Sequence, residues 1–296
     1  MAQPTPLRFE PIDALPVQTA ARLPLSLQIS SPPIFYKSLV LRLLTGTTEI
    51  KCNKTGEVIT QSIDYSTLKW TLNRRITKTI LQRAIRPASL GYYDKLIQAT
   101  NAHHLRFYSD LYQEFCNYFF AQHRQNYLAA FVHLYRVLER ISYAFPLFWA
   151  ARAKEYERTF ETLRKYFSNP TIGELGVFKK FVPEFMPAAA LQLQLNVNIV
   201  SAHTDWQRRH YDLLLSLLSS NAVAYNPHSQ VTMRYENLID LMITIRNRYF
   251  HALTGYSNSF TAQQMVDFDE FSSFLNQDIA NWLAFILFQI FEFELR

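Results

Sequence analysis

An arginine, an amide and a histidine stand close together near the end of an otherwise apolar segment, as Arg246, Asn247 and His251. A guanidinium group can hold a phosphate through parallel hydrogen bonds, and an imidazole can give or take a proton near neutral pH. A metal-free cleavage of RNA requires both groups, because protons move while charge develops on one phosphate. Arg246, Asn247 and His251 therefore supply the parts from which a metal-free RNA-cleaving site can be built.

The six residues from Arg246 to His251 resemble the R-x4-6-H motif of HEPN-domain ribonucleases, in which a polar residue such as Asn247 often follows the arginine. The resemblance implies a helical bundle that pairs as a homodimer and cleaves RNA without a metal or another cofactor. It also implies that His251 assists the attack of the 2′-hydroxyl or protonates the leaving oxygen. Arg246 would hold the phosphate, Asn247 would orient groups in the cleft, and Arg248 is a candidate phosphate contact.

The motif has a geometric requirement of its own. At 100° per residue, Arg246 and His251 lie about 140° apart on an ideal helix, so they do not share a face. Three arrangements satisfy the chemistry: Arg246 reaches around the helix, the helix loosens before Gly255, or two subunits assemble one site.

A second predicted helix carries polar side chains on one side. His133, Arg136 and Arg140 cluster within roughly 80° on an ideal wheel, and we expect them to contact RNA. This helix resembles the long early helix that packs against the motif helix in HEPN folds, where Glu139 would support Arg246 through an ion pair. A plain surface network of ion pairs is the alternative.

A third group of basic residues lies nearer the N-terminus. The pattern of residues 66–86 predicts a basic amphipathic helix, and no acidic residue occurs between Asp64 and Asp94. Arg74, Arg75 and Lys78 are therefore candidate RNA-binding residues. The alternative is a solvated face over the core.

The composition predicts a mainly α-helical protein, because there are only 6 glycines in 296 residues and long stretches follow the helical period. The prolines of residues 1–35 indicate an extended arm, and residues 48–61 indicate a β-hairpin. We expect an arm and hairpin over 1–65, a basic helix and linker over 66–100, and a HEPN-like domain over 101–296. The helices are expected at 102–123, 125–144, 146–167, 173–185, 204–219, 234–252 and 263–296, the last of them apolar enough to be buried in the core or in a dimer interface.

The charge is unevenly distributed along the chain. Basic residues exceed acidic ones by 7 in residues 1–100, whereas acidic residues exceed basic ones by 4 in residues 201–296. We therefore expect the N-terminal part to attract RNA most strongly.

Two cysteines outside any paired motif, no signal-like start and no long apolar run favour a cytoplasmic protein without contact to a membrane. No metal site is expected, and the isolated histidines His203, His210 and His228 are expected at the surface. The preferred function is an endoribonuclease that acts as a toxin or effector in defence against phage, with RNA, a second copy and an antitoxin or defence-complex protein as partners. The alternative is a non-catalytic helical interaction or RNA-binding subunit of a larger defence complex.

Overall fold

The structure is a computed structural model that describes residues 8–29, 33–152, 154–167, 173–250, 259–260 and 266–295. The described chain is mostly helical, with small antiparallel sheets. It forms two compact units: unit 1 comprises residues 1–125 and 283–296, and unit 2 comprises residues 126–282. This division falls after residues 125 and 282, whereas the sequence pattern suggested boundaries after residues 65 and 100.

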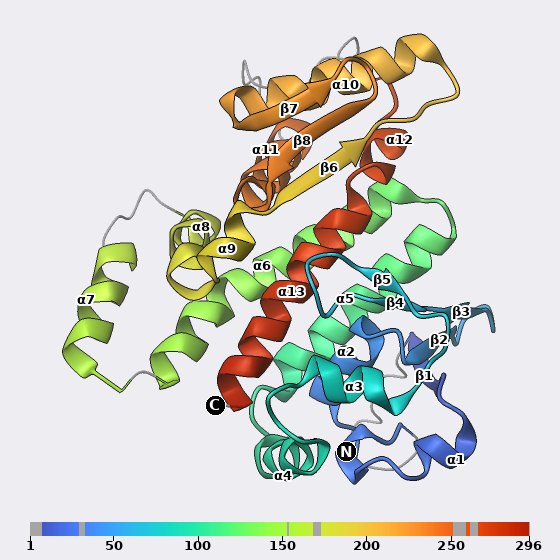
Figure 1. Cartoon of the computed structure of the whole chain (residues 1–296), viewed down its shortest axis with the longest axis vertical. Helices are drawn as coiled ribbons and strands as arrows, with labels where there is room; N and C mark the ends of the chain where they lie inside the picture. The colour runs from blue at the N-terminus through green and yellow to red at the C-terminus, as the bar shows by residue number, and fades with distance from the viewer. Residues whose placement is uncertain are drawn as a thin grey trace. The chain divides into compact units, whose positions relative to one another are not determined.

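Unit 1 combines a three-stranded sheet, a two-stranded ribbon and several helices (Figure 1). Its strands are β1 (Phe9–Asp13), β2 (Thr48–Cys52), β3 (Val58–Thr60), β4 (Ile63–Asp64) and β5 (Thr71–Leu72). Its helices are α1 (Val17–Ala20), the 3-10 turn η1 (Leu25–Leu27), α2 (Tyr36–Leu44), α3 (Lys78–Ala84), α4 (Leu90–Thr100) and α5 (Leu105–His123).

The predicted hairpin of residues 48–61 is confirmed, since β2 and β3 pair antiparallel and Gly56 adopts a positive φ of 74° between them. The prediction of an irregular arm over residues 1–35 is wrong in part. β1 pairs antiparallel with β2, and Pro11 lies opposite Ile50. A proline is tolerated there because β1 is an edge strand, where a missing backbone N–H breaks no ladder bond.

The basic helix expected over residues 66–86 is also corrected. Only Lys78–Ala84 are α-helical, and the preceding residues form the ribbon of β4 and β5. Asn73 explains the difference, because its N–H donates to Ser62 O at 2.8 Å and its side-chain amide donates to Thr45 O at 2.9 Å. These bonds hold the segment extended in place of a local helical turn.

Unit 2 contains the remaining helices, strands and 3-10 turns. The helices are α6 (Tyr127–Arg152), α7 (Tyr156–Phe167), α8 (Glu174–Phe185), α9 (Ala188–Gln192), α10 (Thr204–Leu218), α11 (Leu238–Phe250) and α12 (Phe268–Ser273). The strands are β6 (Gln194–Asn198), β7 (Ala222–Asn226) and β8 (Gln230–Arg234), and the 3-10 turns are η2 (Ser219–Asn221) and η3 (Tyr235–Asn237).

The break predicted at Pro146 does not occur, because α6 continues through this proline. A proline inside a helix removes one backbone hydrogen bond, so packing must compensate. Phe145 supplies it, with ring centroids 5.6 Å from both Phe178 and Phe181 and 4.2 Å from Phe185. Beyond the proline, the Trp149 ring lies 5.4 Å from Phe181, so aromatic contacts hold α6 against α8 on both sides of Pro146.

The sheet of unit 2 was not expected from the sequence. β8 is its central strand and pairs antiparallel with β6 and with β7 (Figure 1). Helix α10 packs beside it, where Tyr211 meets His228 edge to face at 5.4 Å. The segment that joins α10 to α11 is therefore a β-hairpin and not an irregular connection.

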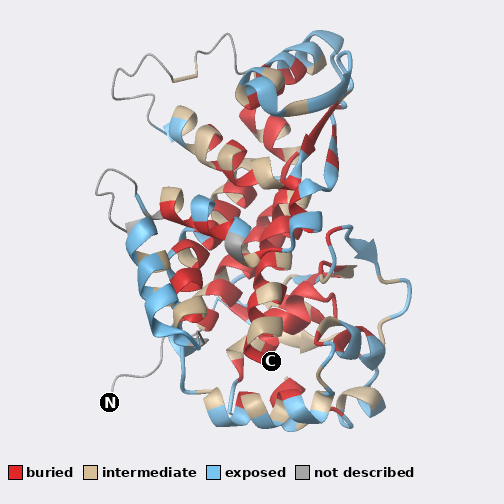
Figure 2. Ribbon diagram, turned by 60° about the vertical axis from the view of Figure 1, so that its left-hand side comes forward, coloured by how far each residue is buried: buried red, intermediate tan, exposed pale blue. Residues whose placement is uncertain are grey.

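Helix α13 (Asn276–Leu295) begins in unit 2 and ends in unit 1. Its burial is confirmed, because Trp282, Leu283, Ile286 and Leu287 are fully inaccessible to solvent. Figure 2 colours the described residues by their burial. Within unit 1, Glu294 forms an ion pair with Lys37 of α2. Among the described helices, none combines the length and apolar character that a bilayer crossing requires.

Candidate functional site

The motif arginine, Arg246, lies near the C-terminal end of α11, just before its last turn. The apolar stripe predicted for this helix is confirmed, since Tyr235 in η3 and Leu238, Met242 and Ile245 in α11 are buried. This packing fixes the opposite side of the helix, where Asn247 is exposed to solvent. The predicted catalytic residue His251 lies outside the described residues.

The Arg246 guanidinium contacts an aromatic ring and an amide oxygen. Its guanidinium carbon lies 5.4 Å from the centroid of the Tyr135 ring in α6, and its Nη1 donates to Asn247 Oδ1 at 3.1 Å. This contact joins α6 to α11, and the helix packing that the HEPN resemblance implies stays a prediction. Arg246 is only partly buried, so its guanidinium is oriented by protein groups while part of it stays accessible.

Tyr135 connects Arg246 with Glu139 electrostatically. Burial raises the pKa of the Tyr135 phenol above its ordinary value, the positive charge of Arg246 opposes that rise, and the Glu139 carboxylate adds to it. A direct ion pair between Arg246 and Glu139 stays a prediction. The sequence reading missed Tyr135, although it stands one helical turn before Glu139 on the helix expected to face the motif.

The other candidates on α6 lie on an accessible side of that helix. Arg136 is exposed, and His133 and Arg140 are partly exposed. The opposite side is core, as expected: Phe131, Leu134, Leu138 and Ile141 have exposed fractions of 1% or less. His133, Arg136 and Arg140 are thus accessible in the same unit as Arg246, and their contact with RNA stays a prediction.

Arg248 and Tyr249 take part in packing. The Arg248 guanidinium carbon lies 4.6 Å from the centroid of the Phe260 ring, and its carbonyl accepts the Phe260 N–H at 3.2 Å. The Tyr249 ring stacks on Phe268 at 4.1 Å with an interplanar angle of 13°. Tyr249 is partly buried, and this stack places its ring against the apolar side chain of Phe268.

Some charges near Arg246 favour a bound phosphate, and others disfavour it. The C-terminal end of a helix carries partial negative charge on its unpaired carbonyl groups, which disfavours a phosphate. Arg248 lies in this last turn and Arg246 just before it, and both supply positive charge near the helix end. Nearer the start of α11, Asp240 is already neutralised by Lys179 of α8 at 2.5 Å.

One histidine prediction is wrong. His210 was expected at the surface, but it is fully buried in α10, where its Nε2 lies 3.0 Å from Glu270 Oε2. Its ring packs against Phe271 and Phe274. The Nδ1 atom is buried without a hydrogen-bond partner among the described residues. A histidine on the apolar side of α10 was the available signal, and Glu270, 60 residues away, could not be paired with it from the sequence.

The N-terminal basic candidates belong to unit 1, whereas the motif belongs to unit 2. Arg74 and Arg75 follow β5, Lys78 begins α3, and all three are exposed. They are therefore not one stripe of a helix, as the sequence suggested.

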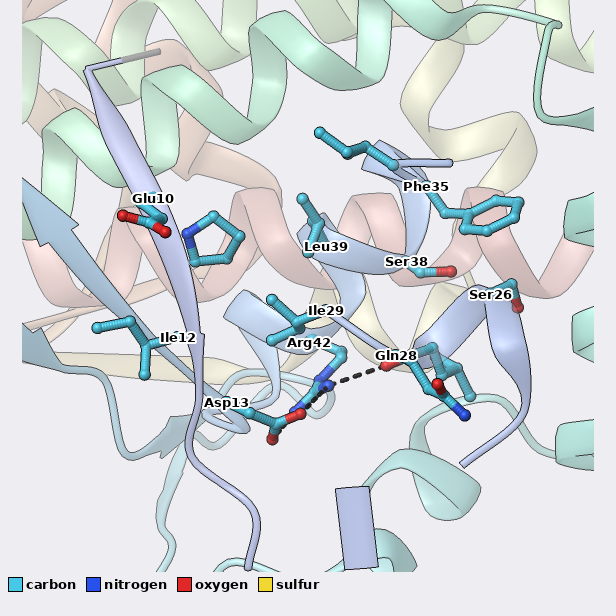
Figure 3. A pocket seen from close by; sticks show the side chains of 13 residues that line it. Glu10, Ile12, Asp13, Ser26, Gln28, Ile29, Phe35, Ser38, Leu39 and Arg42 are labelled. Carbon is cyan, nitrogen blue, oxygen red and sulfur yellow. Dashed lines mark hydrogen bonds and ion pairs between the residues drawn. The ribbon is translucent and has the colours of Figure 1, made fainter. Parts of the chain in front are cut away.

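A cavity of about 420 Å³ in unit 1 surrounds a charged residue that the sequence reading did not single out (Figure 3). Arg42 of α2 is fully buried and forms a paired contact with Asp13, at 2.9 Å from Nη1 and 2.5 Å from Nη2. It also donates to the carbonyl groups of Leu27 at 2.8 Å and Thr47 at 2.7 Å. Four of its five N–H groups are thus used to join β1, η1 and the end of α2, which gives Arg42 a structural role.

Within the described ranges, no three histidine, cysteine or acidic side chains lie together as a metal ion would need. Comparison with family models, with curated proteins and with solved structures finds no match for this chain. The resemblance to HEPN ribonucleases therefore rests on the motif residues themselves.

Proposed function

We propose that the protein is a metal-independent endoribonuclease of the HEPN type that acts as a toxin or effector in anti-phage defence. One observation carries the proposal: Arg246, the first residue of the motif, is oriented by Tyr135 and Asn247 yet remains partly accessible. A guanidinium fixed in this way can receive a phosphate with little further loss of side-chain freedom.

The proposed reaction is a transesterification within the RNA. His251 removes the proton of a 2′-hydroxyl, whose oxygen attacks the neighbouring phosphorus and forms a cyclic 2′,3′-phosphate, while the bond to the 5′-oxygen breaks. The leaving 5′-oxygen takes up a proton from a second imidazolium or from water. Arg246 stabilises the negative charge that develops on the phosphate, and Asn247 orients its guanidinium through the hydrogen bond between them.

A homodimer is part of the proposal. On an ideal helix, Arg246 and His251 point in directions about 140° apart, and a second subunit with its own motif would supply the complementary group to a shared cleft. Cytoplasmic RNA is the proposed substrate, and an antitoxin is the proposed regulating partner.

The test compares the full chain with Arg246→Ala and His251→Ala, using RNA extracted from cells, with a chelator present throughout. We expect His251→Ala to lower the cleavage rate by about 100- to 10,000-fold, because a general acid or base is lost. Arg246→Ala should lower it by about 100- to 1,000-fold, because charge on the phosphate is no longer stabilised. The products should carry cyclic phosphate and 5′-hydroxyl ends.

His203→Ala and Arg234→Ala are the matched controls, since both residues are exposed and lie in the same unit as the motif. They should retain full cleavage and the same arrest of growth on expression. Thermal unfolding of all five proteins separates loss of the site from loss of the fold. Equal cleavage by the wild type and both motif variants would reject the proposal.

A second candidate is a non-catalytic helical or RNA-binding subunit of a defence complex. The packing of Arg246 on Tyr135 and of Arg248 on Phe260 favours it, because such contacts also stabilise a fold without any reaction. RNA binding without a cleavage product, in the test above, is the outcome that this candidate predicts.

A further inference from the structure

The ribbon of β4 and β5 and the turn that follows it carry an unusual concentration of positive charge. We define this region, residues 63–78, as the basic hairpin. Four of its residues are exposed cations: Lys69, Arg74, Arg75 and Lys78. None of the four forms an ion pair with any residue in the described ranges, whereas Arg83 of α3 is paired with Asp64 of β4. The charge of the basic hairpin is therefore available to a partner.

The backbone of the basic hairpin is fixed by unit 1. Asn73 is bonded to Ser62 and to Thr45, and the Arg83–Asp64 ion pair joins α3 to β4. Gly46 permits the close approach: a Cβ built on it would lie 2.8 Å from the carbonyl carbon of Ser62. A partner would thus meet cations on an ordered backbone and would spend little free energy on ordering it.

Large apolar side chains stand among these cations. Trp70 is 41% exposed and Leu72 is 62% exposed. Trp70 directly precedes strand β5 and Leu72 is its last residue, so both exposed side chains lie on the same short ribbon. An exposed indole beside several cations suits a base that stacks on the ring while its phosphates meet arginine and lysine.

The geometry points to the basic hairpin as a binding surface for single-stranded RNA, with Trp70 as the stacking platform and Arg74 and Arg75 as the phosphate contacts. A single strand is favoured over a duplex because only unpaired bases can present their faces to Trp70. A membrane surface is disfavoured because two exposed apolar side chains on a short ribbon bury too little area to anchor a protein. This inference does not depend on the proposed cleavage.

The experiment measures fluorescence anisotropy of a labelled 2′-O-methyl oligouridine of about 12 nucleotides, a length within the range that such surfaces cover. This probe lacks the 2′-hydroxyl, so binding is read separately from cleavage. The full chain is compared with Trp70→Ala, Trp70→Phe and the double variant Arg74→Ala/Arg75→Ala. Controls are Tyr92→Ala, an exposed aromatic residue of unit 1 (50% against 41% for Trp70), and Lys54→Ala/Arg106→Ala, two exposed cations of the same unit.

We expect Trp70→Ala to weaken binding by about tenfold without changing its dependence on salt, because a stacking contact involves no counterion. The affinity of Trp70→Phe for the oligonucleotide should stay within about threefold of the wild-type affinity. The double arginine variant should weaken binding by about tenfold or more and should lower the slope of log affinity against log salt by about 1.4.

Three results would overturn the inference. The first is equal binding by the wild type and the hairpin variants. The second is an equal loss in the control variants, which would indicate a response to net charge alone. The third is tighter binding to an RNA duplex or to vesicles of anionic lipid than to the single strand. Loss of cleavage in the motif variants does not affect these binding measurements. The proposed ribonuclease activity and the proposed RNA-binding surface can therefore be rejected independently.

Discussion

Arg246 differs from an ordinary surface arginine because aromatic and amide groups restrict it from two directions. The Tyr135 ring lies under its guanidinium, and Asn247 accepts one of its hydrogen bonds. A free arginine side chain loses much rotational freedom when it binds a phosphate, so this restriction is already present before a ligand arrives. The effect on a reaction would come through position, and Tyr135 is therefore a positioning residue.

Replacing Tyr135 tests this role at the residue scale. Tyr135→Phe keeps the ring and should retain at least about half of the cleavage rate, whereas Tyr135→Leu should lower it by about 3- to 10-fold through loss of the cation–π contact. Steady-state kinetics should show the loss in kcat with a smaller change in KM, and unfolding by urea should show whether the fold is affected. Tyr143→Leu is the control on the same helix, where the side chain is 46% exposed. Equal losses for Phe and Leu would assign the effect to the hydroxyl group instead of the ring.

What the sequence revealed about single residues depended on where their partners stand in the chain. Arg246 and Asn247 could be selected because the motif is contiguous. His210 and Arg42 could not, since their partners Glu270 and Asp13 are distant in sequence and become neighbours only through the fold. A charged residue inside an apolar helix was the sole signal for Arg42.

At the scale of elements, the buried Arg42–Asp13 ion pair connects an edge strand to helix α2. Removing Arg42 leaves the Asp13 carboxylate, whose side chain is 24% exposed, without its ion pair, and it also removes the hydrogen bonds to the Leu27 and Thr47 carbonyl groups. Arg42→Met should therefore lower the free energy of unfolding by about 3 to 5 kcal/mol. Urea titration followed by circular dichroism measures this change.

The control for Arg42 is Arg106→Met, because the Arg106 side chain is 97% exposed and its pair with Asp110 spans 4.0 Å. Its effect should stay within about 0.5 kcal/mol. The double variant Arg42→Met/Asp13→Leu should recover part of the loss, since no charge then remains unpaired. A loss as small as that of Arg106→Met would contradict the structural role of Arg42.

Long helices could be predicted from the sequence, whereas strands that pair with distant segments could not. Helices α5, α8 and α10 lie close to the predicted ranges because each has enough turns to show an apolar side. Strand β1 was hidden by its proline, and the strands of the β6–β8–β7 sheet have only five residues each. The segment that contains β5 was predicted as helix because its extended form depends on hydrogen bonds from Asn73 to Ser62 and Thr45, which lie outside that segment.

At the scale of the whole molecule, unit 1 buries several groups that lose a proton at alkaline pH. Burial raises the pKa values of Tyr93, Tyr108 and Tyr112 above the ordinary tyrosine value, and it raises the pKa of the Cys116 thiol in the same way. The unfolded chain therefore releases these protons at a lower pH than the folded chain. Stability from these groups is fully present below the unfolded pKa values and decreases as the pH rises above them.

We expect the free energy of unfolding to decrease above about pH 8.5, where an unfolded cysteine begins to ionise, and more steeply above about pH 10 for the tyrosines. Each group contributes up to about 1.4 kcal/mol per pH unit. Cys116→Ala should remove the first part of this decrease. Urea titrations at several pH values between about 8 and 11, with a reducing agent present, compare the free energies of unfolding of the wild type and Cys116→Ala. This pH range covers the ordinary pKa values of cysteine, about 8.5, and tyrosine, about 10.

Cys52→Ala is the matched control. Burial acts to raise the pKa of the Cys52 thiol, but hydrogen bonds from Thr55 and Lys54 and the charge of Arg8 outweigh it, and the pKa lies below its ordinary value. Removing Cys52 should therefore leave the alkaline decrease in place. An identical pH profile for the wild type and Cys116→Ala would show that the thiol does not contribute to it.

Helix α13 has a consequence for the order in which the protein can form on the ribosome. Unit 1 draws on residues 1–125 and on residues 283–296, and all of unit 2 is translated between these two segments. Residues 1–125 are therefore made before the part of α13 that completes unit 1, and the apolar surface that α13 covers stays exposed in the meantime. The delay corresponds to about 160 further residues, or roughly 8 to 30 seconds at ordinary rates of synthesis. During that interval, unit 2 can begin to fold first, and a chaperone bound to the waiting segment would protect it from aggregation.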